Sequence, residues 1–322
     1  MDRAGGRDSQ TIADGYRLFA RREARGVSPV YEAWSEAVAG DDEILDLLAD
    51  LPRAERQPNL VLAAARFHGA AATVESFRRT VIERWDDVRE TVLVRATQTN
   101  EAGRCAVLLP FLAQLPGPLA LLEVGASAGL CLLPDRYSYR YGDDTLDPAD
   151  GPSPVTIECD LGGITPPTTV PHVVWRAGID LSPVDVEDDD ARTWLETLVW
   201  PGQDERRHRL VSALEVARRD PPPVASGDLL DVLPDLAAGA PTEATLVVFH
   251  TAVLAYLSAE DRARFVDLVS DLPGRWISNE GNGVVHRVEV EPEAAGRFVL
   301  AVDGVPRALT DPHGRSAAAL TG

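Results

Sequence analysis

Lysine is missing from this chain of 322 residues, and all 31 of its basic side chains are arginines. The absence of lysine excludes Schiff-base chemistry and a lysine general base. Positive charge is also scarce relative to negative charge, since the formal net charge is −20. A surface of this sign repels phosphate backbones, so we expect no nucleic-acid partner.

Cysteines and long apolar runs are scarce as well. The three cysteines, Cys105, Cys131 and Cys159, form no C-x-x-C pattern, which indicates a reducing compartment and no structural zinc. The six histidines show no H-E-x-x-H spacing, so we expect no metal site. No apolar run approaches the roughly 20 residues of a membrane span, and the first residues lack a secretory apolar segment. We therefore expect a cytoplasmic protein without a membrane partner.

The chain divides by its hydrophobic pattern into two parts. Residues 9–115 have helical periodicity and almost no strand-like runs, which predicts a helical N-terminal domain of five or six helices over residues 1–115. Strand-like and helical segments then alternate, which predicts an α/β, Rossmann-like domain over residues 116–322 with a mostly parallel, doubly wound sheet. The expected strands are Leu119–Val124, Val173–Asp180, Val224–Gly227, Thr245–Phe249 and Trp276–Ser278, and the expected helices are Ala191–Leu198, Glu205–Arg219 and Ala259–Leu272. Trp194 and Trp200 are expected to pack their helix onto the sheet.

Further β segments depart from this alternation. Tyr137–Tyr141 and Val155–Cys159 predict a β-hairpin inserted at about residues 137–172, before the second parallel strand. Near the C-terminus, Asp303-Gly304 predicts a tight hairpin turn. The strand-like runs in that region are Val284–Val290, Phe298–Val302 and Val305–Leu309.

The most informative stretch is LALLEVGASAGL, Leu119–Leu130. An apolar run that predicts a buried strand ends at Glu123 and continues into a Gly-Ala-Ser-Ala-Gly turn and an expected helix. Small residues let a ligand approach the backbone, and free N–H groups at a helix N-terminus attract carboxylate or phosphate. The dinucleotide pattern G-x-G-x-x-G fits less well, because Ser127 replaces its second glycine and Leu130 stands where a third is needed.

In doubly wound sheets, ligands bind beyond the carboxyl ends of the parallel strands, so the residues after each strand are candidates. Asp180 ends the second strand and can accept hydrogen bonds from ribose hydroxyls, or it can cap a helix. Asp143 lies nearer the usual spacing of roughly 20 residues, so both acids are candidates for the ribose. His250 follows the fourth strand and is either a general base or a hydrogen-bonded structural histidine. Glu280, after the fifth strand, is a second candidate catalytic residue.

A polar cluster precedes the first strand. Thr99 or Asn100 can cap a helix over residues 101–115, and that helix must run antiparallel to the strand that follows it. Its N-terminus is therefore expected beside the glycine turn, where polar side chains can line a pocket. The cluster supplies three candidate substrate-binding residues, Gln98, Asn100 and Arg104, and one candidate catalytic residue, Glu101.

The spacing E-x-G-x-x-x-G resembles the first motif of class I S-adenosylmethionine-dependent methyltransferases, and GIDLSP, residues 178–183, resembles the second. The resemblance implies that Glu123 lies near the methionine end of the cofactor and that His250 faces the transferred methyl group. It also implies that Asp228 contacts the adenine amino group while Leu229 packs on the ring. The implied cofactor-binding residues are Glu123, Gly125, Ser127, Gly129, Asp180, Asp228 and Leu229. The N-P-P-Y signature is absent, which disfavours protein-glutamine and DNA-adenine substrates.

Over nearly its whole length the chain also resembles an uncharacterised bacterial family, common in actinobacteria, that is known as a domain of unknown function. This resemblance implies no established activity. The segments that carry it are QTNEAGRCA (98–106), EVGASAGL (123–130), DRYSYRYG (135–142), WRAGIDLSPVDV (175–186), VWPGQDER (199–206) and DPHGR (311–315).

Taken together, these motifs favour an S-adenosylmethionine-dependent transferase, a methyltransferase, that acts on a small molecule. Because the sulfonium makes the methyl group electrophilic, positioning supplies much of the catalysis and a base is optional. A module that binds S-adenosylmethionine or a nucleotide without turnover is the alternative from another class. A cyclase or an aminocarboxypropyl transferase would use the same cofactor differently. A nicotinamide-dependent oxidoreductase is disfavoured by the incomplete glycine pattern.

Overall fold

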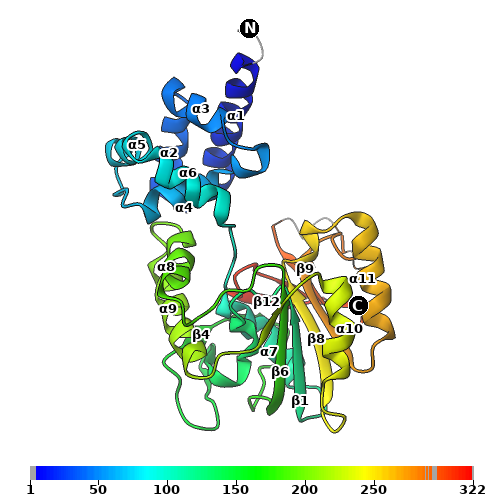
Figure 1. Ribbon diagram of the computed structural model, residues 1–322. Coiled ribbons are helices and arrows are strands. Elements are labelled where there is room, and N and C mark those ends of the chain that lie inside the picture. Colours follow the sequence, from blue (N-terminus) through cyan, green and yellow to red (C-terminus); the bar gives the residue numbers. More distant parts are fainter. Residues whose placement is uncertain (1–4, 287, 289, 292–295, 321–322) are drawn as a thin grey trace. The chain divides into compact units, whose positions relative to one another are not determined.

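The computed structural model of the chain describes residues 5–286, 288, 290–291 and 296–320, with side chains from residue 8 onward (Figure 1). The chain forms two compact units. The helical unit comprises residues 1–99 and 189–208, and the sheet unit comprises residues 100–188 and 209–322. The boundaries of these units differ from those of the expected domains, 1–115 and 116–322. The segment after residue 99 belongs to the sheet unit, and residues 189–208 belong to the helical unit.

Over residues 5–99 the helical unit contains α1 (Gly5–Phe19), α2 (Pro29–Val38), α3 (Asp42–Ala49), α4 (Pro58–Phe67), α5 (Val74–Glu83) and α6 (Trp85–Val94). A short π-helix, η1 (Ala20–Ala24), follows α1, and a 3₁₀ turn, η2 (Arg53–Glu55), precedes α4. Local sequence explains several helix starts. The side chains of Ser28, Asp41 and Thr73 each accept hydrogen bonds from backbone N–H groups in the first turns of α2, α3 and α5.

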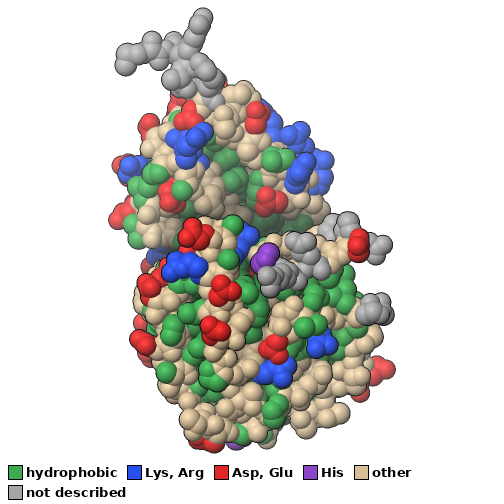
Figure 2. Space-filling view, turned by 90° about the vertical axis from the view of Figure 1, so that its right-hand side faces the viewer, with side chains coloured by type: hydrophobic (Ala, Val, Ile, Leu, Met, Phe, Trp, Pro, Cys, Tyr) green, Lys and Arg blue, Asp and Glu red, His purple; other side chains and the backbone are tan. Residues whose placement is uncertain are grey.

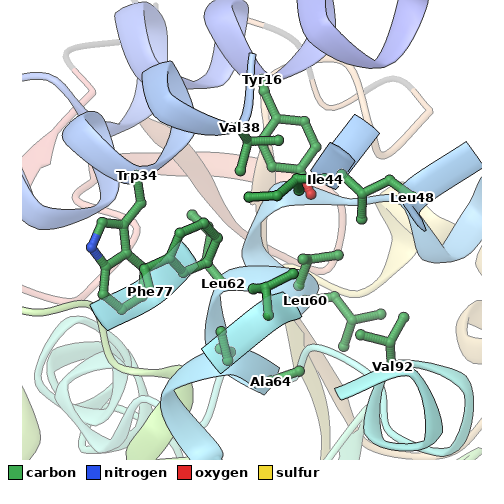
Figure 3. Packing of buried hydrophobic residues seen from close by; sticks show 14 of the residues in the cluster. Tyr16, Trp34, Val38, Ile44, Leu48, Leu60, Leu62, Ala64, Phe77 and Val92 are labelled. Carbon is green, nitrogen blue, oxygen red and sulfur yellow. The ribbon is translucent and has the colours of Figure 1, made fainter. Parts of the chain in front are cut away.

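One hydrophobic core lies inside the helical unit. Trp34 of α2 and Phe77 of α5 stack with ring centroids 4.5 Å apart, and Figure 3 shows them beside aliphatic side chains of the neighbouring helices. Tyr16 of α1 and Ile44 of α3 are buried in the same cluster. The apolar faces of helices from the whole N-terminal segment therefore meet in one place.

Helix α8 (Asp189–Leu198) completes this core. Trp194 is buried in it and donates its indole N–H to the carbonyl of Ala96 at 3.0 Å. Arg66 of α4 donates to two carbonyls at the end of α8, and Trp200 packs on Phe19 with ring centroids 5.3 Å apart. The expectation that Trp194 and Trp200 pack their helix onto the sheet is therefore wrong.

The sheet unit contains a large, mostly parallel sheet in the order β5-β12-β11-β10-β9-β8-β1-β6-β7. The strands β1, β6, β7, β8 and β9 are parallel, and β10 and β11 run antiparallel to their neighbours. Numbered along the chain, the five parallel strands lie in the order 3-2-1-4-5, so the winding direction changes between β1 and β8. The strands are β1 (Leu119–Val124), β5 (Asp160–Gly162), β6 (Val173–Asp180), β7 (Val224–Ser226), β8 (Thr245–Thr251), β9 (Arg275–Gly281), β10 (Phe298–Val302), β11 (Val305–Thr310) and β12 (Ser316–Ala319).

Helices cover both faces of this sheet. Figure 1 shows α10 (Leu229–Ala238) and α11 (Ala259–Asp271) along one face and α7 (Cys105–Leu112) on the other side. α9 (Asp204–Arg219) precedes β7. Side chains alternate along β1, so Leu122 and Val124 pack in the core with α10 and α11, whereas Glu123 points toward the α7 face.

The inserted segment forms a separate three-stranded sheet and not the expected hairpin of Tyr137–Tyr141 with Val155–Cys159. β2 (Ser138–Tyr141) pairs antiparallel with β3 (Asp144–Leu146) and parallel with β4 (Thr156–Glu158). The hairpin closes at Gly142-Asp143. Gly142 has a φ angle of +62°, a conformation that glycine adopts without a steric cost.

The C-terminal hairpin forms at Asp303-Gly304 as predicted, with Val302 opposite Val305. The described residues of 284–290 form turns and irregular structure and not the expected strand, and residues 287 and 289 of that run lie outside the described residues.

Side chains of both charge signs are scattered over the face drawn in Figure 2. Among the helices that the structure describes, none combines the length and apolar character that crossing a membrane requires.

Candidate functional site

The turn after β1 lies where the winding direction of the sheet changes, but it does not lead into an α-helix. Two 3₁₀ turns follow it, η4 (Leu130–Leu132) and η5 (Pro134–Arg136). Pro134 explains this difference, because proline cannot donate a helical hydrogen bond and restricts the residue before it. The expectation of a helix N-terminus facing a ligand is therefore wrong.

The backbone N–H groups of residues 125–129 are also not free, contrary to expectation. Each has an acceptor within the sheet unit at 2.7–3.0 Å. The acceptors are the carbonyls of Ile179 and Ala126, the carboxylate of Asp180 and the side-chain oxygen of Asn100. An anion would have to displace these groups in order to bind the turn.

Gly125 and Gly129 are explained by backbone conformation and packing. Their φ angles are +72° and +68°, a region that glycine adopts most readily. A methyl group added at Gly125 would overlap Val253, and one added at Gly129 would overlap Pro222. The space that we expected a cofactor to occupy beside these two residues is therefore filled by side chains.

Glu123, in contrast, is buried with one carboxyl oxygen unsatisfied by the described residues. Its side chain is 4% exposed, and its Oε2 makes no hydrogen bond to a described residue. Burial raises the pKa of its carboxyl well above the usual range; Cys131 and Asp180 add to this effect and Arg104 opposes it. A buried carboxylate is costly without compensation, so Glu123 is suited to bind a cationic or hydrogen-bond-donating group.

Asp180 supports the turn from the neighbouring strand. Its two carboxylate oxygens accept the N–H groups of Ser127 and Ser182, each at 2.8 Å, and no helix begins directly after it. Ser127 has φ +50°, which is unusual for a residue other than glycine. Asp143 lies in the exposed turn between β2 and β3 of the separate sheet. Of the two ribose candidates, Asp180 is the one on a strand that pairs with β1.

Asp228 follows β7 at the same edge and caps α10. Its Oδ1 accepts the N–H of Leu230 at 2.8 Å, and Gly227 N–H donates to the Asp180 carbonyl at 3.0 Å. Asp228 is exposed and Leu229 is half-buried. Both adenine candidates are therefore accessible and lie next to Asp180.

The segment before α7 contacts both central strands. Asn100 Nδ2 donates to Ser127 Oγ at 2.9 Å, and the buried Arg104 donates to the carbonyl and hydroxyl oxygens of Thr251 at 3.0 and 3.1 Å. This segment lies beside the turn, as its antiparallel course predicts. Its cap, however, is Glu101 and neither Thr99 nor Asn100, and only residues 105–112 are α-helical. Gln98 belongs to the helical unit.

His250 is fully buried, and both of its ring nitrogens have partners. Nδ1 lies 2.7 Å from Glu280 Oε1, and Nε2 lies 3.1 Å from the indole nitrogen of Trp276. Because an indole N–H can only donate, Nε2 accepts and Nδ1 donates its proton to Glu280. The ring also packs edge-on against Phe265 of α11. This geometry is that of a structural histidine.

Glu280 organises the turn after β8. Besides His250, its Oε1 accepts the N–H groups of Val253 and Leu254 at 2.9 and 3.1 Å, at the start of the 3₁₀ turn η6 (Leu254–Tyr256). Its Oε2 is buried and has no hydrogen-bond partner among the residues that the structure describes. Ala252, just before this turn, has φ +57°. Unusual backbone conformations therefore follow both central strands, as they often do at functional sites.

Glu101 lies on the α7 side of the sheet, away from His250. It caps the 3₁₀ turn η3 (Ala102–Arg104) by accepting the N–H of Gly103 at 3.0 Å, and it pairs with Arg209 at 3.0 Å. Side chains alternate along β8, so His250 faces α11 while Thr251 faces Arg104. The three candidate catalytic residues therefore do not converge on one point.

Sequence reasoning did not single out Arg209 or Thr310. Thr310 Oγ1 donates to Oδ1 of the fully buried Asn279 at 2.6 Å, and Asn279 Nδ2 has no partner among the described residues. Arg209 has no distinguishing sequence signal, since it is one of several arginines on α9. A threonine at the end of an apolar strand is a usable but weak signal. The described residues contain no group of three or more His, Cys, Asp or Glu side chains that could hold a metal ion.

The comparison with protein families finds one that matches residues 13–318, described as "Uncharacterized protein conserved in bacteria (DUF2332)". The comparison with curated proteins finds no match. The family match agrees with the expected uncharacterised bacterial family; the methyltransferase resemblance and the actinobacterial origin stay predictions. Because the match covers nearly the whole sequence, the chain belongs to the DUF2332 family.

Proposed function

We propose that the sheet unit binds S-adenosylmethionine at the carboxyl edge of β1, β6 and β7 and uses it for group transfer to a small molecule. The observation that carries this proposal is the buried Oε2 of Glu123 at the end of β1, which has no hydrogen-bond partner among the described residues. The cofactor has an ammonium and a sulfonium group, and a buried carboxylate is stabilised by a cation close to it.

The order of the strands supports the same ligand. In a Rossmann-like sheet of order 3-2-1-4-5, Glu123, Asp180 and Asp228 end three adjacent strands. Each oxygen of Asp180 accepts one N–H and keeps a lone pair for a ribose hydroxyl. Asp228 is exposed beside Leu229, as an adenine contact requires. This order suits a ligand with a cationic end, a diol and a base.

When bound, the cofactor supplies an electrophilic methyl group. The residues of this edge would position it, and burial of the Glu123 carboxylate would exclude water from its cationic end. A second candidate function is binding without turnover. It is favoured by the satisfied partners of His250 and Glu101, which leave neither side chain with an obvious free catalytic atom.

Calorimetric titration with S-adenosylmethionine, S-adenosylhomocysteine and NAD tests the proposal. We expect both adenosyl ligands to bind and NAD not to bind. Asp180→Asn should weaken binding by about 1.5–3 kcal/mol, the range for hydrogen bonds to a charged group. Asp143→Asn is the matched control and should leave the affinity unchanged. Binding of NAD with no binding of either adenosyl ligand would refute the proposal.

Conversion of S-adenosylmethionine to S-adenosylhomocysteine in the presence of a deproteinised cell extract separates the two candidate functions. A transferase gives extract-dependent product, whereas a binding module gives binding in the calorimeter and no product.

A further inference from the structure

A histidine–carboxylate pair lies on the α7 side of the sheet unit. The turn Asp311–Arg315 follows β11, which has the same direction as β9 because β10 is antiparallel to both. The hydrogen bond between Thr310 and Asn279 joins the ends of β11 and β9. The turn therefore lies at the carboxyl edge of the sheet, the edge at which ligands bind in doubly wound folds.

Backbone contacts attach this turn to the segment before α7. Arg104 Nε donates to the carbonyl of Pro312 at 3.0 Å. Gly314 packs directly on Gly103, and neither position has room for a side chain. The N–H of His313 donates to the Asp311 carboxylate at 2.9 Å. These contacts fix the position of His313 relative to Glu101.

The side chain of His313 is partly buried. Its Nδ1 is buried, makes no hydrogen bond to any residue that the structure describes and lies 3.6 Å from Oε2 of Glu101, whose side chain is 2% exposed. The His313 side chain is 34% exposed although Nδ1 is buried, so other atoms of the side chain are accessible. Arg209 pairs with the other oxygen of Glu101, and Arg104, Arg315 and Asp311 are further charged groups near the pair.

The pair is also close to the cofactor edge. Asn100, next to Glu101 in the chain, hydrogen-bonds Ser127 and Ala128 of the turn after β1. Arg104 connects Pro312 to Thr251 at the end of β8. A proton-accepting group at Nε2 of His313 would therefore lie on the same edge as Glu123 and on the face that His250 does not reach.

We infer that His313, oriented by Glu101, accepts the proton of the acceptor substrate. This inference rests on the proposed function. In the substrate complex Glu101 would accept the Nδ1–H, which leaves the lone pair on Nε2, as in other pairs of an orienting carboxylate and a general base. The O–H, N–H or S–H bond of the substrate breaks, its electron pair stays on the nucleophile, and the proton forms an N–H bond at Nε2. Water then takes this proton from the ring. A contact of 3.6 Å in the free protein shortens when such a complex forms.

Carbethoxylation by diethyl pyrocarbonate, which acylates accessible unprotonated imidazole nitrogens, tests the pair without a known substrate. Peptide mapping by mass spectrometry gives the rate at each histidine. We expect His313 to react, the buried His250 to stay unmodified, and the exposed His172 to serve as an internal control. Glu101→Gln should lower the rate at His313 several-fold, because the amide is a weaker acceptor for Nδ1–H, and should leave His172 unchanged.

Glu101 also caps η3, so Glu101→Asp is measured beside Glu101→Gln, with the thermal midpoint and S-adenosylhomocysteine affinity of each variant. The aspartate keeps the charge and should restore part of the His313 rate. An unreactive His313, or an equal rate in wild type and Glu101→Gln, would overturn the pair.

Saturating S-adenosylhomocysteine should protect His313 and leave His172 reactive. If the ligand binds in the calorimeter but gives no protection, the inference fails and the proposed function stands. If the ligand does not bind, the proposed function fails and the inference fails with it.

Discussion

Glu123 is a residue at which folding stability and ligand binding oppose each other. Its folded-state pKa is raised, mainly by burial, above the ordinary value of 4.5. The native state therefore favours the protonated carboxyl, and this contribution to stability is fully present below the ordinary pKa. It is lost as the pH rises toward the folded-state pKa, because the unfolded chain ionises without cost.

Glu123→Gln should therefore stabilise the ligand-free protein, and the gain should grow as the pH rises from the ordinary value of 4.5 toward the raised folded-state pKa. Thermal midpoints of variant and wild type across this range measure the effect. Glu158→Gln, at an exposed position on β4, is the control for the loss of a surface glutamate. The same Glu123→Gln variant should bind S-adenosylhomocysteine more weakly. A loss of stability that grows with pH would mean that the carboxylate has a partner in solution.

We expect His250 to contribute to the folding stability of the protein. His250→Ala removes the acceptor of the Trp276 N–H and one donor to Glu280, and we expect a loss of about 1–3 kcal/mol in the free energy of unfolding for each buried group left unsatisfied. Chemical denaturation measures this loss, with the exposed His172→Ala as the control. Unchanged stability together with lost ligand binding would contradict the structural role.

At the scale of elements, the turn after β1 is determined by conformation and packing together. Gly125→Ala should cost roughly 1–2 kcal/mol for a left-handed backbone and about 1–3 kcal/mol more for overlap with Val253. Gly142→Ala has a similar φ, +62°, and open space around the new methyl group, so it isolates the conformational cost. Val253→Ala combined with Gly125→Ala should recover the overlap cost only. Equal losses at the two glycines, measured by denaturation, would show that Val253 moves freely.

The parallel strands could be predicted because each is a short apolar run bounded by turn residues. Leu119–Val124 and Val173–Asp180 form strands with the predicted bounds. β5 and β12 could not be predicted in this way, since they pair with each other across more than a hundred residues and neither has a strong pattern of its own. Trp194 shows the same difficulty, because helical periodicity predicts which face of a helix is buried but not which elements pack against that face.

The position of a candidate residue could be predicted where it follows from the strand that carries the residue. Glu123 and Asp180 lie at the carboxyl ends of β1 and β6, and Asp228 follows β7, all at the expected edge. The partners of these residues were not predictable, because they come from distant segments. Arg209 contacts Glu101, and Trp276 contacts His250, each from a different element of the fold. Such contacts determine which atoms of a candidate residue are already engaged.

For the whole molecule, the formal net charge of −20 predicts a stability that rises with salt. From about 0.01 M to about 0.1 M ionic strength the Debye length falls from about 30 Å to about 10 Å, which reduces self-repulsion of the compact state. Exposed ion pairs weaken under the same conditions but contribute little. The thermal midpoint in increasing sodium chloride measures the balance, and near the isoelectric point of 4.6 the increase should vanish. A midpoint that falls with salt at neutral pH would mean that ion pairs dominate.

The core of the helical unit is completed by residues 189–208, far along the chain from its first six helices. On the ribosome, residues 100–188 must be synthesised before α8 emerges. At about 5–20 residues per second this delay is on the order of 10 s. Until then, the site of Trp194 on the nascent helices stays open to water and apolar, so the newly made N-terminal segment is a natural client for chaperones at the exit tunnel. The N-terminal unit of this protein therefore cannot complete its folding before most of the chain up to residue 208 has been synthesised.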